Sequence, residues 1–286
     1  FATPPPCFIY LFIKTKLYIY LDFKLKDKKV ISRLLKYSIP MIPNSICWWV
    51  ISISDRTIIS IFLGLSANGI YSVAAKFSGL IVTIYNMFNL SWTESVSLHI
   101  NDEDADSYLS DVFNATTKFF ACGCLAIIAI MPIAFPILIG NDYLEAYNFI
   151  PFLILGSFFN IIMGMLSGIY IGKKKSGEMA KTSILAAISN IVINLLFVNK
   201  LKIWAAVIST IISFIIVSVY RIVDVKKYIN IKIKYLDYII LLIIFIFTTS
   251  LYMINNYCLN IIYILVIILF SIFLNKKMIK SIVNYI

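Results

Sequence analysis

Polar side chains recur on one side of the first long apolar segment of the chain. Asn44, Trp48, Ser52 and Asp55 follow one another at intervals of four, four and three residues, and Arg56 lies four residues after Ser52. In an α-helix, such intervals place side chains on one face. A face that carries a carboxylate, a guanidinium, an amide and a hydroxyl can bind an ion or hydrogen-bond a polar ligand. We therefore expect it to contact protein or water rather than lipid, with Asp55 and Arg56 at the outer end of the helix.

A second polar stripe follows in the next apolar segment. Ser72, Lys76, Gly79, Thr83 and Asn86 are spaced by four, three, four and three residues, and Glu94 lies eight residues further on. A charge near the bilayer centre costs at least about 2.5–3.5 kcal/mol on insertion scales, so each charge inside a span is a candidate functional group. Two interpretations of Lys76 stay open: a structural lysine, paired with Asp55 or reaching outward along its stem, or a cation that lines a cavity. For Arg56, an interfacial ion pair with Asp55 and a ligand-binding role are both open.

Other polar residues offer less chemistry. Ser183, Ala187, Asn190 and Asn194 form a stripe that is typical of hydrogen bonding between packed helices. The one histidine, His99, lies in a predicted connector with no Ser or Cys partner, and the acidic residues at 102–106 lack the ordered spacing of a calcium loop. We predict no catalytic residue, no metal site and no cofactor, and we expect a protein that is not an enzyme.

Apolar segments of membrane-spanning length must position these stripes. Of the 286 residues, 61% are hydrophobic and 14% are charged, against roughly 45–50% and 25% in soluble proteins. Runs of about 18–25 apolar residues match the helix length that crosses a hydrocarbon core of about 30 Å. We predict an all-α integral membrane protein, a polytopic bundle of about eight transmembrane helices. The predicted spans are 36–56, 70–94, 115–139, 148–171, 183–199, 203–221, 236–254 and 258–274.

Basic residues predict the orientation of the chain. The net charge of +11 comes mainly from the segment before the first span and from alternate connectors, among them 173–181 and 221–234, whereas the other side receives only Arg56, Lys200 and Lys202. The positive-inside rule then places both ends in the cytoplasm, and it explains the charge without a nucleic-acid partner. Residues 1–33 are predicted to be an interfacial or cytoplasmic lead-in, or the stub of an earlier helix.

Three runs of sequence carry a family resemblance: 35–44 (LKYSIPMIPN), the Ser-Asp-Arg at 54–56, and 62–76 (FLGLSANGIYSVAAK), with Trp92 and Glu94 extending the pattern. In composition and spacing they resemble the seventh and eighth helices of the polysaccharide and O-antigen flippases (Wzx type). These are members of the multidrug/oligosaccharidyl-lipid/polysaccharide exporter (MOP) superfamily. The similarity extends over residues 30–286.

The resemblance implies a fold. Members of this family resemble two six-helix bundles that face each other across a central cavity, often with two added helices, as in a MATE-like exporter fold. Residues 34–225 would form the second six-helix bundle, and residues 226–286 two additional C-terminal transmembrane helices. The first bundle has no counterpart in this chain, so a missing N-terminal bundle, from a longer chain, would be needed to close the cavity.

The resemblance also implies a function. The family moves an oligosaccharide on a polyprenyl diphosphate, the repeat unit of O-antigen (lipopolysaccharide), capsule or exopolysaccharide, from the cytoplasmic to the outer leaflet of the cytoplasmic (inner) membrane by alternating access. We expect Lys76 and Arg56 to hold the diphosphate or acidic sugars. Hydrogen bonds to sugar hydroxyls would come from Asn44, Ser52, Thr83 and Asn86, and proton or sodium coupling would involve Asp55 and Glu94. A polysaccharide polymerase is a candidate partner.

Two alternatives stay open. A multidrug or other small-molecule exporter of the same superfamily would favour an acidic cavity, and the cationic second stripe counts against it. A membrane-embedded polysaccharide-assembly enzyme would need large loops, whereas the longest predicted connector has about 20 residues, a length typical of a link between helices.

Overall fold

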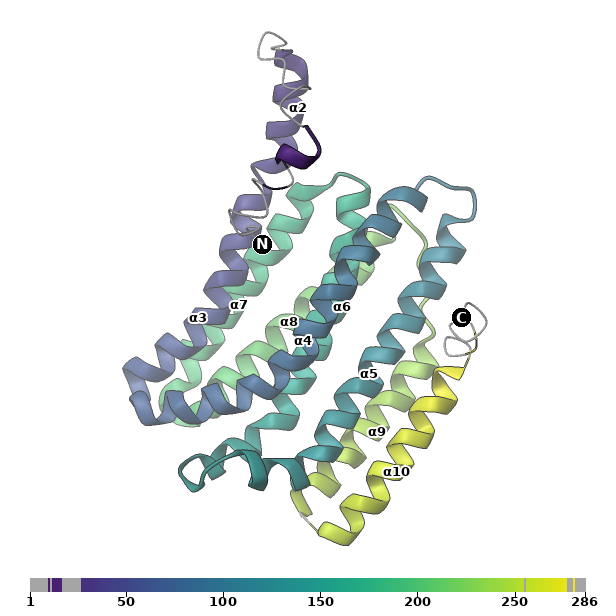
Figure 1. Cartoon of the computed structure of the whole chain (residues 1–286). Helices are drawn as coiled ribbons and strands as arrows, with labels where there is room; N and C mark the ends of the chain where they lie inside the picture. The colour runs from purple at the N-terminus through teal and green to yellow at the C-terminus, as the bar shows by residue number, and fades with distance from the viewer. Residues whose placement is uncertain (1–9, 11, 17–26, 255, 277–279, 281–286) are drawn as a thin grey trace. The chain divides into compact units, whose positions relative to one another are not determined.

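The computed structural model describes residues 10, 12–16, 27–254, 256–276 and 280, except for the side chains of 257 and 258 (Figure 1). The chain divides into two units, Phe1–Ile39 and Pro40–Ile286. Most of the predicted lead-in at 1–33 lies outside the described residues. In the first unit, α2 (Lys28–Ser38) begins after Asp27, whose carboxylate caps the helix by accepting a hydrogen bond from the backbone nitrogen of Lys29 at 2.8 Å.

All the regular secondary structure in the described part of the second unit is helical, and that part contains no β-strand. Its elements are α3 (Met41–Leu63), α4 (Leu65–His99), α5 (Ala105–Leu138), the 3-10 helix η2 (Asn141–Phe149), α6 (Ile150–Gly172), α7 (Ser176–Leu201), α8 (Ile203–Val225), α9 (Tyr235–Ile254) and α10 (Tyr257–Leu274). The eight α-helices from α3 to α10 correspond one to one with the eight predicted spans. The predicted all-α fold class is confirmed.

Seven stretches of the described chain are long and apolar enough to cross a membrane. They are Lys28–Leu63, Leu65–His99, Ala105–Leu138, Asn141–Gly172, Ser176–Leu201, Ile203–Val225 and Tyr235–Ile254. The eighth predicted span coincides with α10, whose apolar stretch Leu259–Leu274 is shorter. The chain is therefore a multi-pass membrane protein.

Helix boundaries differ from the prediction where polar residues begin or end a helix. Helix α3 continues to Leu63, so Asp55 lies about 12 Å before its end at a rise of about 1.5 Å per residue, not at the outer end. The predicted connector between the spans 70–94 and 115–139 is mostly helical, because α4 continues to His99 and α5 begins at Ala105. These predictions were wrong because apolar runs mark the part of a helix inside the bilayer and not its polar turns.

Helices α4 and α6 approach each other closely along three glycines. Gly164, Gly168 and Gly172 recur every four residues on α6 and face Tyr85, Trp92 and Val96 of α4. A Cβ atom on Gly168 would lie 2.7 Å from Nε1 of Trp92, which donates a 2.8 Å hydrogen bond to the carbonyl of Met165. Small residues at such spacing let two helix backbones come together in a membrane, where helices gain little from hydrophobic burial.

Helices α3, α7 and α8 form a second group (Figure 1). Their shared apolar cluster consists of Cys47 and Ile51 from α3, Ala186 and Ala187 from α7, Phe214 and Val217 from α8, and Met163 from α6. The face of α3 that carries Cys47 and Ile51 therefore looks toward α7 and α8.

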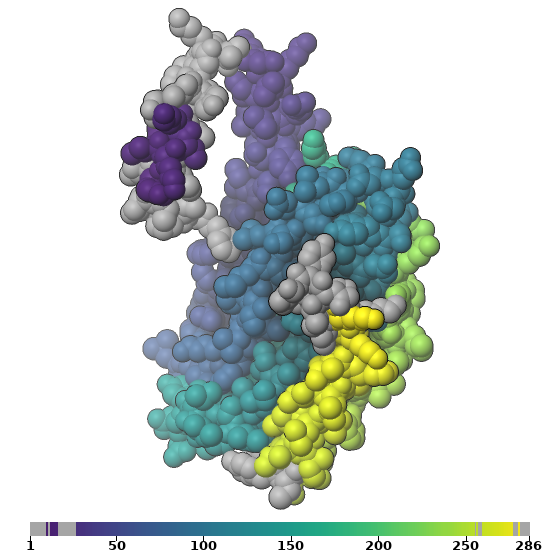
Figure 2. All heavy atoms as spheres, turned by 45° about the vertical axis from the view of Figure 1, so that its right-hand side comes forward, coloured from purple at the N-terminus to yellow at the C-terminus, as the bar shows by residue number. Residues whose placement is uncertain are grey.

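The two C-terminal helices pack against α5. Figure 2 shows α10, in yellow, on the surface of this unit. The connector from α8 to α9, residues 226–234, runs along α5, and we call it the strap. Backbone nitrogens of Asn230, Lys232 and Lys234 donate hydrogen bonds to the side chains of Asp106, Ser110 and Asn114 at 3.2, 2.9 and 3.2 Å. Two residues of an extended chain cover about 6.6 Å, and four residues of a helix cover about 6 Å. Every second residue of the strap therefore stays level with every fourth residue of α5.

Candidate functional site: a buried carboxylate and an exposed basic stripe

The carboxylate of Asp55 is enclosed by four hydrogen-bond donors from three other helices. Asp55 is only 3% exposed. One oxygen accepts from Tyr71 of α4 at 3.0 Å and from Thr210 of α8 at 2.7 Å. The other accepts from Asn194 and Asn190 of α7 at 2.9 and 3.3 Å. All four donors are neutral, so the negative charge is stabilised by dipoles without a cationic side chain.

Further oxygen atoms surround this carboxylate. Ser54 donates to Oδ1 of Asn190 at 3.0 Å, and Nδ2 of Asn190 also reaches the hydroxyls of Thr210 and Ser209 at 3.2 and 3.3 Å. Oδ1 of Asn194 is buried without a hydrogen-bond partner. A buried polar atom without a partner is uncommon and often marks the place of a water or an ion. Carboxylate, amide and hydroxyl oxygens are ligands that suit hard cations. The carboxylate can take up a proton as it stands, whereas a small cation would require Asn190 and Asn194, which point N–H groups at Asp55, to turn their amide oxygens toward it.

The structure excludes one interpretation of Lys76. Among the described residues, no ion pair joins Lys76 to Asp55. Both Tyr71 and Lys76 belong to α4, but Tyr71 is buried against Asp55 while Lys76 is exposed on another face. Of the alternatives left open for Lys76, pairing with Asp55 is therefore ruled out, and the outward-reaching lysine and the cavity-lining cation stay open. The predicted packing role of Asn190 and Asn194 is confirmed, because both are fully buried and bind Asp55 across a helix contact.

A second buried charge, Arg221 of α8, was missed from the sequence. The guanidinium is fully buried and donates from all three nitrogens. Nε binds Thr182 at 2.9 Å, Nη1 binds the Met163 carbonyl at 2.8 Å and also Ser167, and Nη2 binds Ser183 at 3.1 Å and the Met179 carbonyl at 3.2 Å. These are five acceptors for five N–H donors. Arg221 thus joins α6, α7 and α8.

Arg221 was predicted as the last residue of the span 203–221 and was also counted with the basic connector at 221–234 because basic residues cluster there. The assignment to the connector was wrong. The signal that could have corrected it is the apolar Ile222, Val223 and Val225 beyond it, which indicates that the helix continues. Val225 is indeed buried.

The buried carboxylate and the buried guanidinium lie on either side of an apolar layer. Ser183, beside Arg221, and Asn190, beside Asp55, are seven residues apart on α7, or about 10 Å along the helix. The cluster that contains Ala186, Ala187 and Phe214 fills the space between them. Asn44 of α3 accepts a 2.6 Å hydrogen bond from Ser183, so it belongs to the Arg221 side.

The predicted stripe on α3 is divided by the structure. Asn44 and Asp55 face α7 and α8, whereas Ser52 and Arg56 are exposed. At 100° per residue around the helix axis, Asp55 lies within about 20° of Asn44, whereas Arg56 lies about 120° from Asn44. The prediction that all these residues share one face was wrong for Ser52 and Arg56.

The predicted stripe on α4 stays together on one face. Lys76, Thr83, Asn86 and Glu94 are all exposed, and the opposite face packs through Tyr71, Phe77, Tyr85 and Trp92. With α4 starting at Leu65, Lys76 is about 16 Å from that end of the helix. A membrane-spanning helix therefore presents a lysine, a hydroxyl, an amide and a carboxylate on a face that no described residue of this chain covers.

Comparisons with known proteins bear on the class of protein. Residues 7–92 match a family model described as "Polysaccharide biosynthesis protein". Among solved structures, the chain resembles a MOP superfamily transporter from Pyrococcus furiosus Vc1 (DSM3638), with a TM-score of 0.57 and 16% sequence identity, over 77% of this chain and 52% of that one. The reverse polarity of the binding pocket suggests a different function for that transporter. No curated protein sequence matches the chain.

The structural likeness shows that this chain has the fold of about half of a MOP transporter. With the family match on residues 7–92, it confirms the predicted resemblance to the polysaccharide and MOP-type family.

Proposed function

We propose that this chain is the second half of a flippase that moves a polyprenyl-diphosphate-linked oligosaccharide from the cytoplasmic to the outer leaflet by alternating access. The observation that carries the proposal is the exposed polar face of α4, with Lys76 deep in a membrane-spanning helix. Such a face is costly against lipid but suits a water-filled cavity. The match to a polysaccharide biosynthesis model over residues 7–92, which includes this part of α4, supports the choice of substrate class.

Lys76 and Arg56 would attract the diphosphate or acidic sugars. An anionic headgroup that crosses a region of low dielectric constant needs fixed cations beside its path, because Coulomb interactions are strong there and hydration is lost. Ser52, Thr83 and Asn86 would hydrogen-bond sugar hydroxyls from the same exposed faces. Asn44 is proposed for the same role, with its amide oxygen also bound to Ser183.

Asp55 would be the site of ion coupling. Its four neutral donors and the unpaired Oδ1 of Asn194 form a buried polar cluster that would take up a proton, or Na⁺ once the two amide groups turn their oxygens inward. Because these donors come from α4, α7 and α8, a change of charge at Asp55 would alter the packing of the helices that carry the exposed face. Glu94, exposed on α4, remains a second candidate for coupling.

The remaining assignments follow from the same proposal. Residues 34–225 would be the second six-helix bundle and 226–286 two additional helices, in the cytoplasmic membrane with both ends of the segment in the cytoplasm. An N-terminal bundle of the same full-length chain would close the cavity over α4. A polysaccharide polymerase would receive the translocated unit.

Deleting the full gene in its host and extracting the lipid-linked oligosaccharides tests this function. If the chain belongs to a flippase, finished repeat units accumulate on the cytoplasmic leaflet, because assembly continues and crossing stops. Truncated or absent units would indicate an assembly enzyme, and an unchanged pool would indicate an exporter of another compound. Either result would contradict the proposal.

A further inference from the structure

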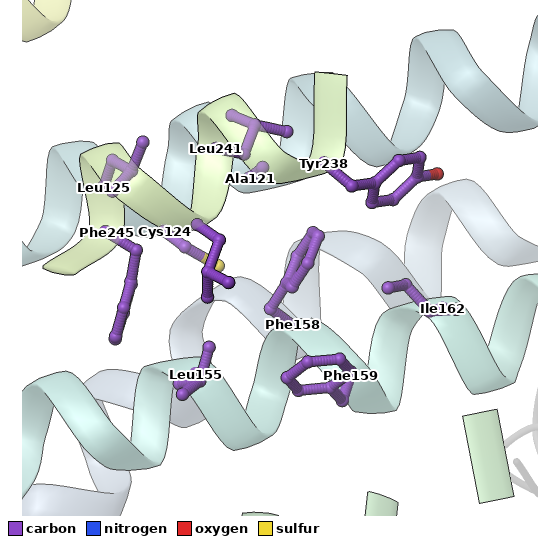
Figure 3. Close-up of a pocket in the computed structure, with 11 residues that line it drawn as sticks. Ala121, Cys124, Leu125, Leu155, Phe158, Phe159, Ile162, Tyr238, Leu241 and Phe245 are labelled. Atoms are coloured by element: carbon purple, nitrogen blue, oxygen red, sulfur yellow. The ribbon is translucent and has the colours of Figure 1, made fainter. Parts of the chain in front are cut away.

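An apolar cavity lies between α5, α6 and α9, and Figure 3 shows the residues that line it. Its volume is about 200 Å³. The side chains that shape it include Ala121 and Cys124 of α5, Phe158 of α6, and Tyr238, Leu241 and Phe245 of α9. The cavity is separate from both the Asp55 site and the exposed face of α4.

The cavity is lined on the α5 side by two small residues, where larger side chains would fill the space. Ala121 and Cys124 occupy adjacent turns of α5 and are 6% and 3% exposed, so they are deep in the structure and still leave a gap. The lining is hydrocarbon apart from the Cys124 thiol and the Tyr238 hydroxyl, and that hydroxyl donates to Thr117 at 3.0 Å. Figure 3 shows the ring of Tyr238 at one end of the cavity, with its hydroxyl turned away from Leu125 and Phe245. The cavity can therefore hold hydrocarbon but offers no free hydrogen bond to a polar ligand.

An apolar lining does not by itself select a ligand inside a bilayer, because lipid tails are as apolar as the cavity. Selection must come from close packing and from a polar group at one end. The cavity has such an end. On the same face of α5 that carries Ala121, one and two turns earlier, lie Thr117 and Asn114, and Asn114 binds the strap at Lys232 and Lys234.

Basic groups gather at this end, and an acidic group lies beside them, with Nζ of Lys234 4.0 Å from Oδ1 of Asp111. Lys232 and Lys234 are exposed on the strap, directly before the first turn of α9, and Tyr238 follows Lys234 by four residues. Lys118 of α5 forms an ion pair with Asp237 of α9 at the same level. Exposed lysines beside a helix crevice at the membrane surface attract anionic lipid headgroups.

We propose that the cavity binds one acyl chain of an anionic phospholipid of the bilayer, whose phosphate lies against Lys232 and Lys234. The volume is below the roughly 300–1,000 Å³ of pockets for drug-sized molecules, so the cavity holds a segment of a single chain. The bound lipid fills the gap between α5, α6 and α9 and so fixes the C-terminal helices on the bundle. The site does not depend on what the protein transports.

Native mass spectrometry of the delipidated full-length protein tests the site, with phosphatidylglycerol, phosphatidylcholine and a polyprenyl phosphate added separately. We expect one tightly held phosphatidylglycerol per chain and weak binding of phosphatidylcholine. Ala121→Leu, which fills the cavity, should weaken phosphatidylglycerol binding by at least about tenfold, a measurable change in Kd. Ile137→Phe adds volume to the same helix at a residue that is 78% exposed and should leave binding unchanged.

A second pair of variants keeps the test informative if Ala121→Leu fails to fold. Lys232→Glu with Lys234→Glu changes only exposed residues and should reduce phosphatidylglycerol binding, whereas Lys200→Glu with Lys202→Glu, two exposed lysines at the α7–α8 turn, should not. Equal binding by all variants, no retained phosphatidylglycerol, or preferential binding of the polyprenyl phosphate would each overturn the proposal. Transport by the wild-type protein would be unaffected by these outcomes, so the proposed function is tested separately.

Discussion

The hydroxyl of Thr210 donates a 2.7 Å hydrogen bond to the carboxylate of Asp55, across 155 residues of sequence. This bond ties α8 to α3, and the neighbouring bonds from Asn190, Asn194 and Tyr71 tie α7 and α4 to the same carboxylate. A single ionisable group thus organises four helices. Protonation or cation binding at Asp55 changes which donors it can hold, and this is how an ion would bias the arrangement of the bundle.

If Asp55 is the proposed coupling site, replacing it should remove the stabilisation of the protein by Na⁺ or by a proton. We expect the wild-type protein in detergent to gain stability with Na⁺ in place of choline, or with a change of proton concentration. Saturation at about 100 times Kd adds about 2.7 kcal/mol. Asp55→Asn keeps the size of the side chain and removes its charge, so the gain should vanish. Thermal unfolding followed by tryptophan fluorescence measures it.

Glu178→Gln is the matched control for this prediction. Glu178 is an acidic residue on α7 that pairs with Lys181, away from the Asp55 site, so its variant should respond to the ion as the wild-type protein does. An ion response of full size in Asp55→Asn would show that the coupling site lies elsewhere.

Lys76→Glu should reduce translocation by at least about tenfold, because it places a repulsive charge on the proposed path of an anionic headgroup. Its level in the membrane should not change, since α4 packs through its opposite face. Lys76→Arg should retain activity. Exchanging the charges, Asp55→Lys with Lys76→Asp, should not restore function, because Asp55 binds neutral donors rather than Lys76. Rescue by the exchange, or normal transport by Lys76→Glu, would refute the assignment.

Arg221 should tolerate methionine better than lysine. Lysine keeps the buried charge but brings three donors in place of five and cannot reproduce the planar fork that reaches Thr182, Ser183 and Met163. Methionine removes the charge, and replacement of a buried charge by a well-packed apolar group is often neutral. We expect Arg221→Lys to lower the free energy of unfolding by about 1–3 kcal/mol more than Arg221→Met, measured in mixed micelles. Equal stability of Arg221→Lys and the wild type would contradict the five-donor geometry.

Gly168→Ala should destabilise the contact between α4 and α6. The new Cβ would lie 2.7 Å from Nε1 of Trp92, and overpacking of this kind costs about 1–3 kcal/mol. Gly79→Ala, at a helical position with nothing within 4 Å of the new atom, should instead be neutral or stabilising by about 0.5–1 kcal/mol. Opposite signs in a thermal-unfolding comparison are the expected result, and a loss of stability for both variants would point to a general effect of glycine replacement.

The helical fold followed from the sequence because a bilayer demands long apolar runs, and such runs are visible in one chain without its neighbours. The stripe from Ser72 to Glu94 was also predictable, because helical periodicity places Lys76, Thr83 and Asn86 on one face whatever that face contacts. The periodicity of one helix does not reveal which other helices its faces contact. Asp55 was assigned to the outer end of its helix, although its partners lie on α7 and α8, far along the chain.

Arg221 shows the limit of rules based on composition. The positive-inside rule counts basic residues near the ends of spans, and Arg221 lies among lysines, so counting assigned it to a connector. Its five acceptors come from α6 and α7, at 38 to 58 residues of separation, and no local pattern indicates them. The cavity behind Ala121 and Cys124 was equally invisible, because a small residue signals a gap only when the facing residues are known.

Translocation by the reconstituted protein tests the central claim most directly. The full-length protein would be placed in proteoliposomes with a polyprenyl-diphosphate-linked oligosaccharide of the host, and arrival of the sugar in the opposite leaflet would be followed by its accessibility to an added glycosidase. The account predicts that the wild-type protein exposes the sugar far faster than empty liposomes do and that Lys76→Glu does not. Equal rates for wild type, variant and empty liposomes would contradict it.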